Sequence, residues 1–91
     1  MPTYLIERDF PGAKDLTPQQ LRDIARTSNA TVDTLGVPYT WRQSFAAGDK
    51  IYCLHEAESA EVIVEHARRA GFPVNLVSEV ANTFDPQTAD A

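Results

Sequence analysis

The sequence predicts an α+β fold in which four strands and two helices follow one another in the order β-α-β-β-α-β. Three observations indicate it: short apolar runs with a two-residue period, two stretches with helical spacing, and turn residues between them. Two crossovers joined by a hairpin give the ferredoxin-like sandwich, an antiparallel sheet with two helices on one face. We expect residues 1–91 to form a single domain, with a core over about residues 3–84 and a frayed tail over 85–91.

The first half of the chain predicts a strand followed by a helix. Residues 3–9 (TYLIERD) begin with aromatic and β-branched side chains, and residues 10–13 (FPGA) break the strand. Residues 17–20 (TPQQ) have the form of a capping box with proline at the first helical position. Gly36 suits the position just after the helix end. The residues at helical spacing between these signals are Leu21, Ile24, Ala25, Ser28, Val32 and Leu35.

The second half predicts a hairpin, a helix and a last strand. Residues 39–46 (YTWRQSFA) alternate, and residues 47–50 connect them to a strand over 51–56. A second helix begins after Ser59 and ends at Gly71, and residues 74–83 form the last strand. The alternation places four residues of the second strand on one face: Tyr39, Trp41, Gln43 and Phe45. The apolar stripe of the second helix contains Val62, Ile63, His66, Ala67 and Ala70.

Composition and charge exclude several classes of protein. The formal net charge is −5 and the sequence pI is about 4.8, whereas a nucleic-acid-binding surface is basic. No stretch approaches the roughly 18 apolar residues of a membrane span, and the N-terminus lacks the pattern of a signal peptide. Cys53 is the single cysteine, so no disulfide can form within the chain. We therefore expect a cytoplasmic protein that binds neither nucleic acid nor membranes.

Both faces of the predicted sheet carry apolar side chains. In the third strand, Ile51 and Cys53 share one face while Tyr52 and Leu54 share the other. A monomer with helices on one side would have a polar face on the other. The pattern favours a homodimer packed through the sheet faces, and a monomer with exposed apolar groups is the alternative.

The two histidines and the cysteine lie close together in sequence. At 1.5 Å per helical residue and about 3.3 Å per strand residue, His66 should lie level with Cys53 or Tyr52 rather than with His55. The two imidazoles are therefore not expected to share a metal within one chain. His66 is either a ligand or base at the helix–sheet junction or a core histidine with one hydrogen-bonded nitrogen. Cys53 suits a small buried side chain, and His55 beside Glu56 is a candidate for metal binding.

Three glutamates form a second pattern. Glu7, Glu56 and Glu79 lie on three neighbouring strands, and matching registers would bring several carboxylates to one face. Such a set could bind a divalent cation or act in acid–base chemistry. The alternative is that arginines such as Arg8 and Arg42 pair with acids as surface ion pairs. Known metal, nucleotide and nucleophile motifs such as HExxH, CxxC and GxGxxG are absent.

Three stretches, "YLIERDFPGA", "DKIYCLHEAES" and "EHARRAGFPVNLVSEV", together resemble the domain-of-unknown-function 4242 family, which includes small nickel-binding proteins. The resemblance covers about Thr3 to Pro86 and implies a ferredoxin-like fold and a homodimer. The nickel-binding branch carries histidines at positions that fall on Ala67 and Phe72 here. His66 is one place before the first of these, about 100° away around the helix.

These observations predict a small cytoplasmic homodimeric binding protein for Ni²⁺ or another divalent transition metal, acting in sequestration or homeostasis. The candidate metal ligands are His55, His66 and Glu56. The alternative is a cofactor-independent enzyme, of oxygenase, isomerase or cyclase type, with a pocket between helices and sheet. A structural or accessory subunit is a third hypothesis, and no organic cofactor is indicated. The pocket candidates are Tyr4, Glu7, Trp41, Cys53 and Glu79.

Overall fold

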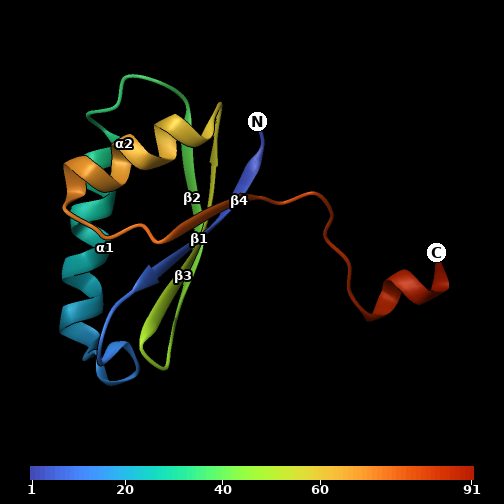
Figure 1. The fold of residues 1–91 in the computed structure, drawn as a ribbon, viewed down its shortest axis with the longest axis horizontal. Coiled ribbons are helices and arrows are strands. Elements are labelled where there is room, and N and C mark those ends of the chain that lie inside the picture. The colour runs from blue at the N-terminus through green and yellow to red at the C-terminus, as the bar shows by residue number, and fades with distance from the viewer.

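The computed structural model describes residues 1–91 and contains a four-stranded antiparallel sheet with two α-helices on one face (Figure 1). The elements are β1 (Thr3–Asp9), α1 (Pro18–Val32), β2 (Tyr39–Ala47), β3 (Lys50–Ala57), α2 (Ala60–Ala70) and β4 (Leu76–Glu79), with 3-10 helices at Ala13–Asp15 and Pro86–Asp90. The strands lie in the order β2-β3-β1-β4. This topology confirms the predicted βαββαβ fold class. Neither α1 nor α2 has the length and apolarity that a bilayer crossing requires.

The core lies between the two central strands and the helices, because alternate residues of each strand point to the same face. Ile63 of α2 is fully buried against this layer. The helix-facing residues of β1 and β3 pair across the sheet as Tyr4 with His55, Ile6 with Cys53, and Arg8 with Ile51. Two members of this buried set, Arg8 and His55, are polar. The core therefore contains ionisable side chains as well as apolar ones.

The strand β2 departs from the uniform alternation that its sequence predicts. Its pairing with β3 is irregular between Trp41 and Gln43, so that Arg42 forms a bulge. Residues after the bulge change faces: Ser44 faces the helices together with Trp41, whereas Gln43 and Phe45 face away. The prediction that Gln43 and Phe45 share a face with Trp41 is therefore wrong. A one-residue insertion moves every later side chain to the other face.

The helix α1 begins as the capping box predicts. The Thr17 side chain accepts a hydrogen bond from the Gln20 backbone, and the Gln20 side chain accepts one from the Thr17 backbone. The helix ends at Val32, earlier than the expected end near Leu35. There the chain tightens into a turn, in which the Leu35 N–H donates to the Val32 carbonyl at 3.1 Å. Gly36 adopts a positive φ of 69°, a conformation that glycine adopts without steric cost.

The strand β4 is shorter than its sequence predicts. The expected strand over residues 74–83 is limited to Leu76–Glu79. Its one partner is β1, which begins at Thr3, and the Val80 N–H makes a last bond of 2.8 Å to the Thr3 carbonyl. Beyond that point the chain has no neighbouring strand with which to pair. Hydrophobic alternation indicates where a strand can form, whereas the length of its partner decides where it ends.

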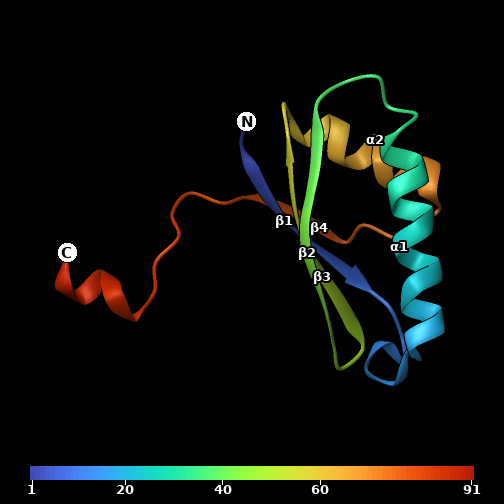
Figure 2. The ribbon, with the colours of Figure 1, turned by 180° about the vertical axis from the view of Figure 1, so that it is seen from behind.

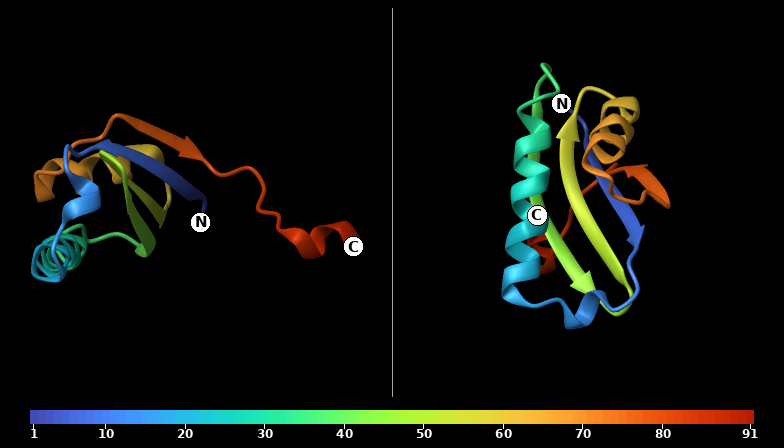
Figure 3. Two further views of the ribbon diagram at one scale, coloured as in Figure 1. Left: turned by 90° about the horizontal axis from the view of Figure 1, so that it is seen from below. Right: turned by 90° about the vertical axis from the view of Figure 1, so that its left-hand side faces the viewer.

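The face of the sheet away from the helices has no covering layer within the chain (Figure 2). After β4 the chain leads away from the sheet and ends in the Pro86–Asp90 helix (Figure 3). Phe84, on this segment, is 84% exposed. The open face, as we call it, carries the apolar side chains of Leu5, Phe45, Tyr52, Leu54 and Leu76.

Candidate functional site

The two histidines of the chain meet in the core, at the end of the sheet nearest α2. His55 on β3 is 1% exposed and His66 on α2 is fully buried. Their ring centroids are 5.3 Å apart, with the rings inclined at 64°. The prediction that His66 lies level with Cys53 or Tyr52 rather than with His55 is therefore wrong. That prediction requires α2 to run back along β3, whereas α2 runs at a steep angle to this strand (Figure 1). His66 therefore stays beside His55.

Tyr39 and Ser28 fix the orientation of the two rings. The Tyr39 hydroxyl is hydrogen-bonded to His55 Nδ1 at 2.5 Å, and the Tyr39 ring stacks on His66 with centroids 4.9 Å apart. Ser28 Oγ on α1 is hydrogen-bonded to His66 Nε2 at 3.2 Å. The other nitrogen of His66, Nδ1, is buried and has no hydrogen-bond partner. Such an atom is uncommon in folded proteins and calls for an explanation.

Burial keeps the two histidines neutral. It lowers the pKa of His55 to about 3, and the charges of His66 and Arg8 contribute to the same shift. Burial also lowers the pKa of His66, against a smaller opposing effect of the Ser28 backbone. Burial raises the pKa of Tyr39, so its hydroxyl stays protonated. At neutral pH the site therefore holds two uncharged imidazoles, the form in which histidine binds metals.

A buried arginine lies next to this cluster. Arg8 on β1 is 3% exposed, and its Nη1 donates a hydrogen bond of 2.8 Å to the Pro73 carbonyl. Its guanidinium lies over the Phe72 ring, 5.4 Å from the centroid. The ion pairs of the chain join other residues, and Arg8 takes part in none of them. A charge that is buried without a partner is rare in proteins.

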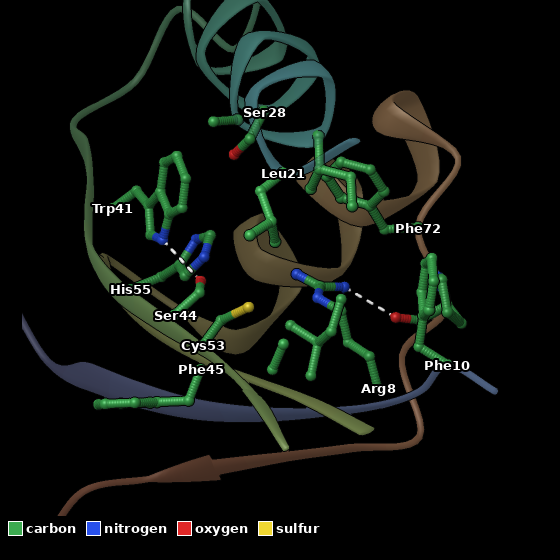
Figure 4. A pocket seen from close by; sticks show the side chains of 15 residues that line it. Arg8, Phe10, Leu21, Ser28, Trp41, Ser44, Phe45, Cys53, His55 and Phe72 are labelled. Atoms are coloured by element: carbon green, nitrogen blue, oxygen red, sulfur yellow. Dashed lines mark hydrogen bonds between the residues drawn. The ribbon is translucent and has the colours of Figure 1, made fainter. Parts of the chain in front are cut away.

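A cavity of about 290 Å³ lies between α1 and the sheet, beside His55 (Figure 4). Its walls are largely apolar, with Leu21 of α1 on one side and Trp41 and Cys53 of the sheet among those on the other. The polar side chains that reach it are Arg8, Ser28, Ser44 and His55. No aspartate or glutamate lines it.

The three strand glutamates do not gather into one site. Glu56 pairs with Arg42, and Glu7 lies 3.7 Å from Lys50 Nζ. Both glutamates lie on the open face, whereas Glu79 is paired with Tyr4 of the helix-facing set. The carboxylate cluster, one of the two interpretations of these residues, is therefore absent. Surface ion pairs, the alternative interpretation, account for Glu7, Glu56 and Arg42. The expectation that Arg8 forms such a pair is wrong, because Arg8 is buried and takes part in no ion pair.

The prediction that Glu56 joins the two histidines as a metal ligand is wrong, because Glu56 lies on the opposite face of the sheet from His55. No group of three or more His, Cys, Asp or Glu side chains is close enough together to hold a metal ion. The family histidine positions, Ala67 and Phe72, lie next to the cluster. Ala67 is buried on α2, and the Phe72 ring centroid is 6.2 Å from that of His66.

Of the five expected pocket residues, Trp41 and Cys53 line the cavity, Tyr4 lies in the core, and Glu7 and Glu79 lie away from the cavity. Three residues of the site, Arg8, Ser28 and Tyr39, are absent from the candidates that the sequence predicts. A signal for Arg8 was available, because it follows Tyr4 and Ile6 at two-residue spacing and so belongs on the buried face of β1. The roles of Ser28 and Tyr39 depend on how α1 and β2 pack, which no local pattern shows.

Comparisons with known proteins agree with this fold. The model of the family described as "Nickel responsive protein SCO4226-like" matches residues 4–80. No curated protein matches the chain. The crystal structure of SCO4226 from Streptomyces coelicolor A3(2) superposes with a TM-score of 0.73 at 24% identity, over 90% of this chain and 99% of that one. That likeness shows a shared fold. Since the family model spans most of the sequence, the chain belongs to the nickel-responsive SCO4226-like protein family.

Proposed function

We propose that the chain is a small homodimeric binding protein for a transition metal such as nickel, with His55 and His66 as its imidazole donors. The observation that carries this proposal is the buried pair of neutral rings, in which His66 Nδ1 has no partner. The name of the family supports nickel as the metal. Imidazole nitrogens are suitable ligands for nickel. Sequestration or homeostasis of the metal is the role that such a site would serve.

The imidazole nitrogens of the histidine pair are suitable donors for nickel, but two donors are fewer than a complete coordination shell requires. Both rings are held in a neutral state, but no third His, Cys, Asp or Glu joins them. The remaining coordination positions would be filled by water, by a small ligand or by a second copy of the chain. Arg8 lies close enough to lower the pKa of both histidines, so its charge also opposes a bound cation. We therefore expect weaker binding than at a closed site with four protein ligands.

The homodimer of this proposal would form through the open face. Two of its apolar side chains, Phe45 and Leu76, are each about half exposed, at 48% and 51%. A self-complementary apolar face is the usual basis of a twofold-symmetric dimer. The C-terminal segment leads away from the sheet and does not cover this face (Figure 3). A second copy would supply the missing layer, as the pattern of both sheet faces predicts.

Calorimetric titration with Ni²⁺ tests the metal proposal. The unmodified protein should bind, and His55→Asn and His66→Asn should each weaken binding about tenfold or more. Because the chain has only two histidines, the double variant contains no imidazole and should not bind at this site. Glu56→Gln is the matched control and should bind as the unmodified protein does. Absence of heat from the folded unmodified protein, or unchanged binding by the folded double variant, would contradict the proposal.

A further inference from the structure

Two small residues of β2 help to leave space for the cavity beneath α1. Ser44 and Ala46 on β2 lie where larger side chains would reach toward α1. On the opposite wall, Leu21, Ile24 and Ala25 present an apolar surface. An apolar cavity of about 150 Å³ can hold a benzene molecule. At about 290 Å³, this cavity has room for an aromatic or branched aliphatic group with a short polar end.

One charge reaches this apolar space, and it is the buried guanidinium of Arg8. Figure 4 shows the group directed toward the middle of the cavity, with one nitrogen bonded to the Pro73 carbonyl. That bond uses Nη1, and no aspartate or glutamate of the chain forms an ion pair with the guanidinium. A guanidinium has five N–H donors in a fixed fork that suits a carboxylate. The buried charge therefore lacks the partner that a bound anion would supply.

The Ser44 hydroxyl is a second hydrogen-bond donor, on the wall of the cavity that the sheet forms. Ser44 Oγ accepts a hydrogen bond of 2.9 Å from Trp41 Nε1, which leaves the hydroxyl hydrogen available. Both side chains line the cavity. Acidic side chains, which would repel an anion, are absent from the lining. The cavity thus combines donors and a positive charge with a mostly apolar wall, a pattern typical of small-molecule sites.

We propose that this cavity binds a small monocarboxylate with an apolar body, whose carboxylate is held by Arg8 in a bidentate pair. A neutral molecule would leave the guanidinium without a counter-charge. A phosphate would demand more donors than the cavity provides and would gain nothing from the apolar walls. The proposal goes beyond metal binding and does not depend on it, because Arg8 repels cations and attracts anions.

Ligand-observed NMR and calorimetry on the metal-free protein test the proposal, with phenylacetate as the probe. The comparison compound is phenylacetamide, which has the same shape and no charge. We expect phenylacetate to bind at least about tenfold more tightly than phenylacetamide, because a hydrogen bond to a charged group is strong. Equal affinity for the two compounds, or no binding of phenylacetate at millimolar concentration, would overturn the proposal. This comparison needs no variant.

Substitution of Arg8 separates a ligand-binding role from a structural one. Arg8→Met keeps the long apolar stem and removes the charge, and it should lower the affinity for phenylacetate about tenfold to a hundredfold. The affinity for phenylacetamide should stay unchanged. Arg26→Met is the matched control, since the Arg26 side chain is 73% exposed. If the folded Arg8→Met protein binds phenylacetate as tightly as the Arg26→Met protein does, Arg8 serves only to anchor Pro73 and the proposal fails. Nickel titration of the same variant distinguishes the two proposals, because loss of Arg8 should not abolish metal binding.

Discussion

His55 and His66 lie with their ring centroids 5.3 Å apart in the core, one on β3 and the other on α2, which runs at a steep angle to that strand (Figure 1). Both rings are neutral because they are buried, and Tyr39 contacts both of them. A change to either histidine or to Tyr39 should therefore affect the whole cluster of three side chains.

The stability of the protein should fall as the pH is lowered from neutrality. In the unfolded chain His55 takes up a proton near its ordinary pKa of 6.5, whereas in the folded chain its pKa is about 3. Protonation therefore favours the unfolded state, and the loss begins below about pH 6.5. Between about pH 7 and about pH 5, the free energy of unfolding should fall by about 2 kcal/mol from His55 alone. Urea unfolding at the two pH values measures this difference.

The groups that surround His55 contribute to the same pH dependence. His66 on α2 also has a lowered pKa, Arg8 on β1 adds a positive charge, and Tyr39 on β2 stays protonated. A His55→Asn variant should lose less stability than the unmodified protein over the same pH range. An equal loss in both proteins would show that other groups control the acid sensitivity.

The hydrogen bond between Tyr39 and His55 should contribute measurably to folding. Tyr39→Phe removes the hydroxyl and leaves His55 Nδ1 buried without a partner. We expect a loss of about 1 to 3 kcal/mol in the free energy of unfolding. Tyr52→Phe is the control, because Tyr52 lies on the open face away from this cluster. Thermal unfolding of the two variants should separate them clearly, and equal melting temperatures would count against the role of this bond.

Burial against the sheet should dominate the stability contributed by α2. Ile63 is fully buried, so Ile63→Ala should cost about 2 to 5 kcal/mol through lost burial and the cavity left behind. Val64, the next residue, is 49% exposed, and Val64→Ala should cost about 0.5 kcal/mol or less. Chemical denaturation of both variants tests this difference. Similar losses for the two would mean that α2 does not pack as described.

The open face should determine the oligomeric state. Leu54→Arg places a charge among the apolar side chains of this face and should convert a dimer into a monomer. Val64→Arg, on the exposed side of α2, should leave the dimer intact. Analytical ultracentrifugation of both variants and of the unmodified protein measures the change. A monomeric unmodified protein at micromolar concentration would contradict the dimer proposal.

The order of the elements could be predicted from the sequence because each had a local signal. The capping box at Thr17 and the glycine after α2, Gly71, both lie at the helix boundaries that the structure shows. The bulge at Arg42 and the early end of β4 had no such signal, since both depend on a neighbouring strand. Local patterns therefore predict which elements form, and pairing decides their registers and lengths.

The site was harder to predict because it depends on angles between elements. The residue spacing along β3 and α2 predicts a separation between His55 and His66 that holds only if the helix runs antiparallel to the strand. The steep angle between α2 and the strand replaces that separation with a contact (Figure 1). Arg8 could have been assigned to the buried face from its spacing in β1. Its lack of a charged partner could be seen only in three dimensions.

The most direct test of the proposed histidine site is X-ray absorption at the nickel edge of protein loaded with one equivalent of Ni²⁺ and passed through a desalting column. We expect nickel to remain bound and to show the multiple scattering of two imidazoles, from His55 and His66, with oxygen ligands completing the shell. The spectrum of the double His55→Asn, His66→Asn variant should show no imidazole. Nickel that is lost on the column, or that is bound by oxygen ligands alone in the unmodified protein, would contradict the account.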